Sequence, residues 1–184
     1  MEKVGCITFN NVREFDGVTR SLIKDFILKE DVKDALEHDD FDTVFKKWRD
    51  YHSNYLPRSL IKVFLEAGID FLSYMHKIPN YFFENCEFIE CVEIPANITT
   101  IGWWDVFKYT NLKKFIIKKR NRSNALNMAR STFYSINNSW KQGNKTEYEF
   151  EGTKEEFYDI INYGNPNNDK NYITFICSNG EIKV

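Results

Sequence analysis

The chain has 184 residues, of which 42% are hydrophobic and 28% are charged, and its formal net charge is −2 at pH 7. This composition excludes a disordered chain and is sufficient for a packed core. No apolar run is long enough to span a membrane and no apolar signal segment follows the N-terminus, so we expect a cytoplasmic protein without membrane partners.

The N-terminal part, residues 1–77, combines one short strand pattern with a longer helical pattern. Ile7 and Phe9 alternate with polar residues, which predicts a strand that covers the first edge of a sheet. From about residue 16 to residue 74, apolar residues recur at helical spacing, so residues 1–77 are predicted to form a helical N-terminal cap. The three apolar stripes are Val18, Leu22, Phe26 and Ile27; Phe41, Val44, Phe45 and Trp48; and Leu60, Val63, Phe64 and Ala67.

One pattern of apolar residues occurs twice between residues 78 and 117, at a constant offset. The matched pairs are Ile78 and Ile101, Phe83 and Val106, Ile89 and Leu112, Val92 and Phe115, and Ile94 and Ile117. A period of this size, about 23 residues, is typical of leucine-rich repeats, in which each unit buries the apolar face of its neighbours. We therefore expect the matched strand residues to be buried together in one core.

Alternation within the two predicted strands places Val92 and Phe115 inward and Glu93 and Lys114 on the outer face. Trp103 and Trp104 lie between the strands and have two interpretations. Packing in the core or between units is favoured, and the alternative is that one of them is an exposed interface anchor.

The third unit is predicted to be longer than the first two. Its strand is expected near residues 147–150, well beyond the position that lies one period after the strand at 114–117. About ten extra residues therefore lie in this unit, and insertions in repeat proteins usually lie on one face and often serve binding.

The C-terminal residues from Tyr148 onward predict a strand, a turn at Gly152, an amphipathic helix and a final strand. Together with the repeat, this ending resembles the BspA-like (Treponema pallidum type) leucine-rich repeats over residues 78–184. The residues that match the closing unit of that family are Gly152, Thr153, Glu156, Phe157, Cys177 and Gly180.

The resemblance implies an α+β fold in which the helical cap precedes a short leucine-rich-repeat solenoid with about four parallel strands. Under this interpretation, residues 78–147 hold the repeats with a basic insertion, and residues 148–184 form a βαβ-type closing unit. Leucine-rich repeats of this kind present a rigid curved surface and generally bind other proteins.

Charge is strongly divided along the chain. Residues 106–146 contain ten Lys or Arg residues and no Asp or Glu, whereas residues 1–105 and 147–184 are both acidic. This basic segment is either an anion-binding surface or a balance for the acidic flanks, for instance through Lys113 beside Glu90. The candidate binding residues are Lys113, Lys114, Lys118, Lys119, Arg120, Arg122, Arg130 and Lys141.

Four of these candidates come directly after Ile117, which is predicted to face inward. Because the chain is expected to leave the core at that point, we predict that the side chains are solvated. The four residues are Lys118, Lys119, Arg120 and Arg122.

Structural roles explain the remaining candidate sites better than functional ones. The four cysteines lack zinc-binding spacing, which indicates reduced core thiols. The acidic cluster between Glu37 and Asp42 has no calcium-loop spacing, and Asp40 as a helix N-cap explains it. Because no catalytic motif such as G-x-S-x-G, H-E-x-x-H or a P-loop occurs, we expect no enzyme activity, no metal and no cofactor.

Two functional hypotheses follow. The first is a non-catalytic protein-binding module, for example an inhibitor or host-factor binder of the kind that phages and bacteria use as accessory proteins. The second is a nucleic-acid or ribonucleoprotein binder that acts through residues 106–146. A small-molecule substrate is not expected.

Overall fold

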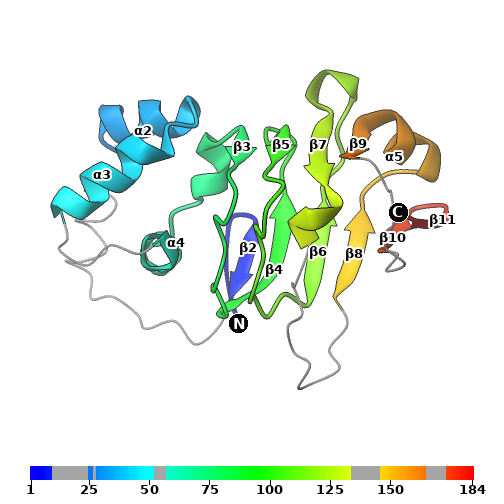
Figure 1. Ribbon diagram of the computed structural model, residues 1–184, viewed down its shortest axis with the longest axis horizontal. Coiled ribbons are helices and arrows are strands. Elements are labelled where there is room, and N and C mark those ends of the chain that lie inside the picture. The colour runs from blue at the N-terminus through cyan, green and yellow to red at the C-terminus, as the bar shows by residue number, and fades with distance from the viewer. Residues whose placement is uncertain (10–24, 27, 52–56, 134–145, 165–172) are drawn as a thin grey trace.

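The computed structural model describes residues 1–9, 25–26, 28–51, 57–133, 146–164 and 173–184. It shows a mixed α/β chain in which two sheets lie side by side (Figure 1). Helices α2, α3 and α4 lie beyond one end of the sheets, and α5 lies near the other end (Figure 1).

The larger sheet has seven strands in the order β1-β2-β4-β6-β8-β10-β11. The strands are β1 (Glu2–Val4), β2 (Ile7–Phe9), β4 (Ile89–Ile94), β6 (Lys114–Ile117), β8 (Glu147–Phe150), β10 (Thr174–Cys177) and β11 (Gly180–Lys183). Strands β4, β6, β8 and β10 run parallel to one another, as the repeat predicts. Strand β2 pairs antiparallel with β4, which confirms the predicted strand over the first edge.

The smaller sheet has four parallel strands in the order β3-β5-β7-β9. They are β3 (Lys77–Ile78), β5 (Thr100–Ile101), β7 (Leu126–Ala129) and β9 (Ile161–Gly164). From β3 to β10 the chain alternates between the sheets, so each winding contributes one strand to each sheet. Apolar side chains of both sheets, for example Ile101 and Phe115, are buried in one hydrophobic cluster, because each winding buries the apolar side of its neighbours.

The predicted register of the strands is confirmed. Val92 lies opposite Phe115 and Ile94 opposite Ile117, which is the offset that the repeat predicts, and all four side chains are fully buried. The other predicted core residues, Ile89 and Leu112, are also buried in the same hydrophobic cluster. Strand β8 begins at Glu147, opposite Lys114, so the prediction that the third unit is longer than the first two is confirmed as well.

The loops between the strands follow an offset one residue longer than that of the strands themselves. The loop residues with positive φ are Tyr81 (61°), Asn85 (61°), Asp105 (47°) and Tyr109 (58°), so Tyr81 corresponds to Asp105 and Asn85 to Tyr109. Phe83 accordingly stacks on Phe107 with ring centroids 5.3 Å apart, and the predicted match of Phe83 to Val106 is wrong by one residue. The extra residue lies after β5, in the loop that begins at Gly102. A larger residue would not fit at position 102, because a Cβ on Gly102 would lie 2.5 Å from the Asn80 backbone nitrogen.

Strand β7 was not predicted, because the third unit was interpreted only as an insertion. Its sequence, Leu-Asn-Met-Ala, lacks the β-branched and aromatic residues that usually signal a strand. Leu126 and Met128 are nevertheless buried, and β7 joins β5 to β9. The part of the predicted insertion at residues 134–145 lies outside the described residues.

The N-terminal helices are α2 (Glu30–Glu37), α3 (Phe41–Tyr51) and α4 (Pro57–Glu66), followed by the 3₁₀ turn η1 (Phe71–Tyr74). Helices α3 and α4 coincide with the second and third predicted stripes. Asp40 accepts a hydrogen bond from the Thr43 backbone N–H at 3.1 Å, which confirms its predicted capping role. Val18, Leu22 and Ile27 of the first stripe lie outside the described residues, as does the side chain of Trp48.

The C-terminal helix α5 (Lys154–Ile160) begins with a capping box, in which Thr153 and Glu156 bond each other's backbone N–H. After α5 the chain forms β9 in the smaller sheet and then the antiparallel pair β10 and β11. The prediction of one final strand was therefore incomplete. Cys177 lies opposite Gly180, whose φ of 129° permits the tight turn between these two strands.

A row of aromatic rings joins the two ends of the molecule through the core. The rings are Phe64, Phe71, Phe83, Phe107, Phe115, Tyr148, Phe175 and Phe157, with successive centroids 5.1–6.2 Å apart. Such contacts add to the hydrophobic stabilisation of burial. The helices and the sheets therefore share one hydrophobic core. No helix among the described residues is long and apolar enough to cross a membrane.

Candidate functional site

The basic residues on and next to β6 are paired with carboxylates of the neighbouring strands. The Lys113 ammonium lies 2.8 Å from the Glu90 carboxylate, as the charge-balance interpretation predicts. The Lys114 ammonium lies 2.7 Å from Glu149, and this hydrogen bond raises the pKa of Lys114. Both pairs join neighbouring windings of the sheet, where opposite charges attract and neutralise each other.

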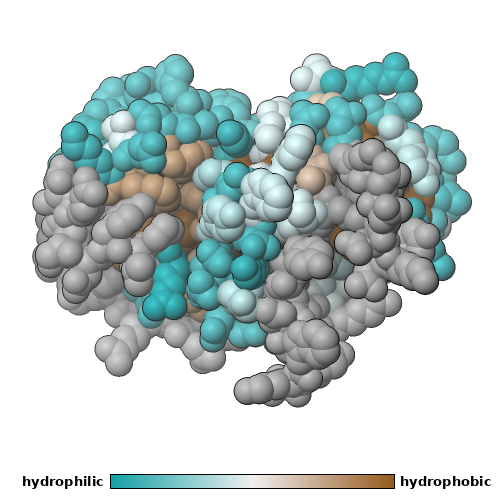
Figure 2. All heavy atoms as spheres, in the orientation of Figure 1, coloured by the Kyte–Doolittle hydropathy of each residue, from teal (hydrophilic) through white to brown (hydrophobic). Residues whose placement is uncertain are grey.

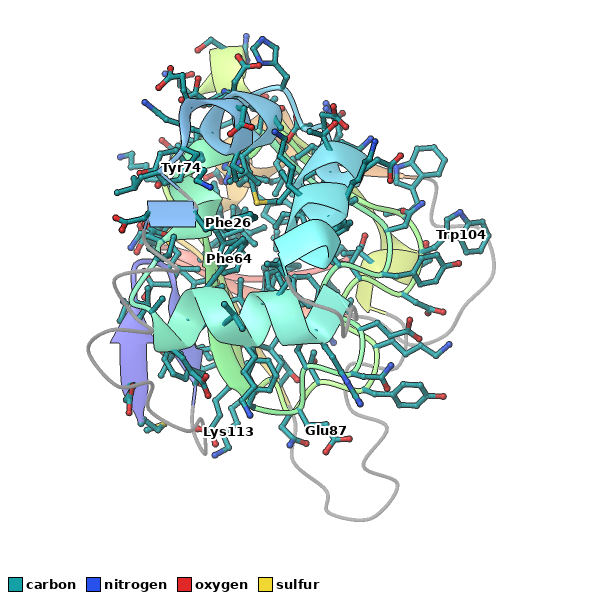
Figure 3. All side chains as sticks on the ribbon, turned by 90° about the vertical axis from the view of Figure 1, so that its left-hand side faces the viewer. Phe26, Phe64, Tyr74, Glu87, Trp104 and Lys113 are labelled. Atoms are coloured by element: carbon teal, nitrogen blue, oxygen red, sulfur yellow. The ribbon has the colours of Figure 1, made fainter. Side chains whose placement is uncertain are left out.

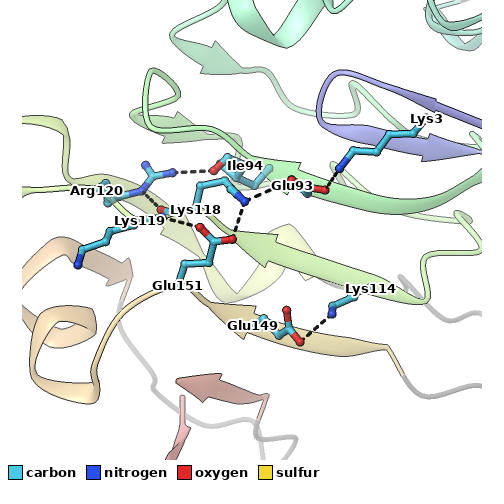
Figure 4. Close-up of polar contacts among 9 residues, drawn as sticks. All are labelled: Lys3, Glu93, Ile94, Lys114, Lys118, Lys119, Arg120, Glu149 and Glu151. Atoms are coloured by element: carbon cyan, nitrogen blue, oxygen red, sulfur yellow. Dashed lines mark hydrogen bonds and ion pairs between the residues drawn. The ribbon is translucent and has the colours of Figure 1, made fainter. Parts of the chain in front are cut away.

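Lys118 takes part in a larger network on the outer face of the seven-stranded sheet (Figure 4). Its ammonium bonds the Glu151 carboxylate and lies 3.5 Å from Glu93, which also accepts a hydrogen bond from Lys3. Burial alone would raise the pKa of Glu93, but the two lysines outweigh burial and hold that pKa below its ordinary value. These charges are therefore engaged within the protein.

Arg120 is only 6% exposed, so the prediction that its side chain is solvated is wrong. Its guanidinium donates hydrogen bonds to the backbone carbonyls of Ile98 at 2.7 Å, Pro95 at 3.0 Å and Ile94 at 3.1 Å. Figure 4 shows the bond to Ile94. Burial lowers the pKa of Arg120 to about 10, which leaves the group charged at neutral pH. Arg120 therefore fastens the turn after β4 to the segment after β6.

The other predicted basic residues remain at the surface or lie outside the described part. Arg122 is exposed and its guanidinium lies 2.8 Å from the Asp159 carboxylate. Lys119 is exposed, and among the described residues no carboxylate forms an ion pair with its ammonium. The side chain of Arg130 and the whole of Lys141 lie outside the described residues. The described cations therefore do not form an open basic surface.

A different surface gathers large aromatic side chains, in the loops that lead from the smaller sheet to the larger one. Trp103 and Trp104 are 60% and 59% exposed, so the favoured prediction that they pack in the core is wrong. Tyr81 and Tyr109 are 49% and 41% exposed. We call these four residues the aromatic face. Trp104 points away from the body of the protein (Figure 3), and residues of intermediate hydropathy occupy the middle of this side (Figure 2).

The backbone of the aromatic face is unusual for such bulky residues. Tyr81 and Tyr109 have φ values of 61° and 58°, in the left-handed region that usually favours Gly, Asn or Asp. The equivalent positions in the neighbouring loops are occupied by Asp105 and Asn85, which tolerate this conformation. A tyrosine there costs stability on the order of 1 kcal/mol, and backbone strain of this kind is concentrated at functional sites.

Hydrogen bonds hold the two aromatic loops against each other. The Tyr81 N–H donates to the Trp104 carbonyl at 3.1 Å, and the Trp104 N–H donates to Oδ1 of Asn80 at 3.2 Å. The Asn85 N–H donates to the Lys108 carbonyl at 2.9 Å. These bonds fix the loop backbone, so a ligand would meet a surface whose main chain is already ordered.

Charged groups lie among these aromatic residues. The Lys108 ammonium lies 2.9 Å from the Asp105 carboxylate and 3.9 Å from Glu84. It also lies over the Tyr109 ring, 5.3 Å from the ring centroid. The aromatic face therefore already supports a cation–π contact with a side chain of its own.

Sequence reasoning identified the tryptophan pair but missed Tyr81 and Tyr109. Both tyrosines fall outside the five matched apolar pairs of the repeat, so the core does not require them. The signal available in the sequence was the presence of large aromatic residues at positions where the repeat requires no core residue. Such residues could have been predicted to lie at the surface.

Metal-binding clusters and reactive thiols are two features on which a catalytic site could be built. No group of three or more His, Cys, Asp or Glu side chains that could hold a metal occurs in the part of the chain that the structure describes. Burial raises the pKa of Cys6 to about 11 and raises that of Cys86 further. Both thiols are therefore protonated at neutral pH and are poor nucleophiles.

Comparison with known protein families identifies the central part of the chain. Residues 66–140 match the family model described as BspA type Leucine rich repeat region (6 copies), so this part is a BspA-type leucine-rich repeat region, as the repeat predicted. Neither the curated proteins nor the solved structures gave a match. Leucine-rich repeats generally mediate protein–protein interaction and are typically non-catalytic. The match includes the aromatic face and does not reach residues 148–184.

Proposed function

We propose that this chain is a non-catalytic protein-binding module whose leucine-rich repeat region binds its partner through the aromatic face. One observation carries the proposal. Four large aromatic side chains are exposed together within the repeat region, and two of them occupy left-handed backbone positions. Neither core packing nor backbone preference explains aromatic residues at those two positions, whereas binding does.

The residue types of the aromatic face are those that dominate protein interfaces. Tryptophan and tyrosine bury roughly 150–250 Å² each and are enriched among the residues that supply most of the binding free energy. Because the loops are already held by hydrogen bonds, little backbone order has to be gained on binding. An interface centred on Trp103 and Trp104 is therefore energetically favourable.

The wider architecture fits this role. We propose that residues 1–77 cap a short solenoid formed by residues 78–147, and that residues 148–184 close it. In this arrangement, the capped ends prevent further stacking and leave the loops as the accessible surface. A cytoplasmic inhibitor or host-factor binder of phage or bacterial accessory type would suit this design.

Site-specific photo-crosslinking in the native cell lysate tests the proposal. A photoreactive amino acid is placed at position 104 and, as a matched control, at position 158, where Tyr158 is 66% exposed on α5. We expect one protein to crosslink from position 104 and not from position 158. The double variant Trp103→Ala/Trp104→Ala should bind the purified partner at least about 30-fold more weakly, whereas Tyr158→Ala should bind it normally.

Two results would contradict the proposal. One is unchanged partner affinity in a folded Trp103→Ala/Trp104→Ala variant. The other is equal crosslinking from positions 104 and 158, which would indicate nonspecific association rather than a binding site.

The alternative function, nucleic-acid or ribonucleoprotein binding through residues 106–146, receives less support from the described side chains. Lys113, Lys114, Lys118 and Arg122 are paired with carboxylates, and Arg120 is buried. Nucleic acid that stays with the purified protein at low salt and leaves at high salt, measured by the ratio of absorbance at 260 and 280 nm, would favour this alternative.

A further inference from the structure

We propose that the segment bound by the aromatic face is an arginine-bearing stretch of the partner protein. This inference rests on the proposed protein-binding function and adds the chemistry of the ligand. It is carried by the combination of exposed aromatic rings with an excess of carboxylates in the same two loops.

The charge of the two loops differs from that of the basic segment they adjoin. Residues 79–88 and 102–112 contain Glu84, Glu87 and Asp105 but only one cation, Lys108. The formal charge of these two loops is therefore −2, whereas residues 106–146 as a whole are strongly basic. A cationic ligand is attracted to this surface, and an anionic one is repelled.

The arrangement around Lys108 is an internal example of the contact that we propose for the ligand. This ammonium contacts the Asp105 carboxylate and lies over the Tyr109 ring, so a cation is held between an acid and an aromatic face. The outer aromatics Tyr81, Trp103 and Trp104 offer further ring faces. Glu84 and Asp105 both lie within 4 Å of the Lys108 ammonium, so their two negative charges exceed its single positive charge. A guanidinium suits such a surface because it stacks on aromatic rings and bonds carboxylates in a planar fork.

Other ligand classes fit this surface less well. An amphipathic helix requires aliphatic groups in a groove, but the large hydrophobic side chains exposed in these two described loops are all aromatic. Single-stranded nucleic acid would stack on the rings, but its phosphates would meet a net negative charge. An arginine side chain uses both the rings and the carboxylates.

Fluorescence anisotropy with defined peptides tests the inference on the full chain. The probe is a fluorescein-labelled peptide of five Gly-Arg repeats, compared with five Gly-Lys and five Gly-Ser repeats. We expect the arginine peptide to bind at least about tenfold more tightly than the lysine peptide, and the serine peptide not to bind. Trp103→Ala/Trp104→Ala should reduce arginine-peptide binding by at least about tenfold.

A carboxylate variant separates the local charge from the net charge of the protein. Asp105→Asn removes one negative charge, and Asn keeps the left-handed backbone that Asp105 adopts at a φ of 47°. It should weaken the arginine peptide about three- to tenfold, whereas Glu181→Gln on the distant strand β11 should leave binding unchanged.

The outcomes also separate the inference from the proposed function. Equal binding of the arginine and serine peptides, or arginine-peptide binding that survives loss of both tryptophans, overturns the inference. Tighter binding of an oligosaccharide or of oligothymidylate than of the arginine peptide overturns it as well. If the tryptophan variants lose the crosslinked partner while the arginine peptide does not bind, the inference fails and the protein-binding function stands.

Discussion

The outer face of the seven-stranded sheet and the aromatic face are built by the same windings but differ in what they leave available. The sheet face carries lysines and glutamates at high density, and most of these charges are paired with each other. The aromatic face carries fewer charges but exposes four large rings. A high density of charge in the sequence is therefore a poorer guide to a binding surface than aromatic residues that the core does not use.

The geometry of parallel windings explains the difference. Within the sheet, each strand places its side chains beside those of the next strand, so Lys114 reaches both Glu147, which lies opposite it, and the diagonal neighbour Glu149. In the loops, Tyr81 and Tyr109 occupy positions whose counterparts on the neighbouring winding are Asp105 and Asn85. Neither tyrosine therefore has an aromatic residue at the equivalent position of the neighbouring winding on which its ring could stack.

The largest expected effect concerns Arg120, a buried cation of the basic segment. Arg120→Met should lower the free energy of unfolding by roughly 3–5 kcal/mol, because three backbone carbonyls lose a charged donor. Urea denaturation followed by circular dichroism measures this loss. Lys119→Met, next in sequence but exposed, should change stability by less than about 0.5 kcal/mol. A similar loss in both variants would show that Arg120 has no special structural role.

A smaller effect is expected from Glu93, which joins Lys3 and Lys118 across the sheet face. Glu93→Gln should cost roughly 1 kcal/mol at pH 7, because the two lysines lose a shared carboxylate. The pKa of Glu93 is lowered in the folded protein, so its stabilisation is present above its ordinary pKa of 4.5 and is lost as pH falls through the folded value.

Thermal unfolding between pH 7 and about pH 3 checks this prediction. The difference in Tm between the wild type and Glu93→Gln should shrink as the pH falls, whereas Glu181→Gln should match the wild type throughout. A difference that stays constant down to the acid limit would mean that the carboxylate charge is not what stabilises the sheet face.

The smallest stability effect, and one of opposite sign, is expected on the aromatic face. Tyr81→Asn and Tyr109→Asn should leave stability unchanged or raise it by up to about 1 kcal/mol, because Asn tolerates positive φ better than Tyr. Partner affinity should nevertheless fall in both variants. Urea denaturation and binding to the crosslinked partner measure the two effects separately. Destabilisation by more than about 1 kcal/mol would assign these tyrosines a structural role instead.

The amino-acid sequence by itself determined the strand register and the starts of two helices. Alternating apolar residues such as Val92 and Phe115 fix which side of each strand is buried, because a shift of one residue would expose the whole apolar row. Asp40 and Thr153 mark helix starts because their side chains cap the first turn of the helix that follows them. The repeat also identified the family to which residues 66–140 belong.

Only the tertiary structure decided which of the charged and aromatic side chains are buried and which are exposed. Arg120 is buried because the carbonyls it bonds, on Ile94, Pro95 and Ile98, belong to the preceding winding and are brought beside it only when the chain closes a full turn. Trp103 and Trp104 lie in a loop whose offset from the preceding loop is one residue longer than the strand offset, so the apolar period of the strands does not predict which way their side chains point. Periodicity reports which residues share a face of a strand, whereas contacts between windings depend on how the loops close in three dimensions.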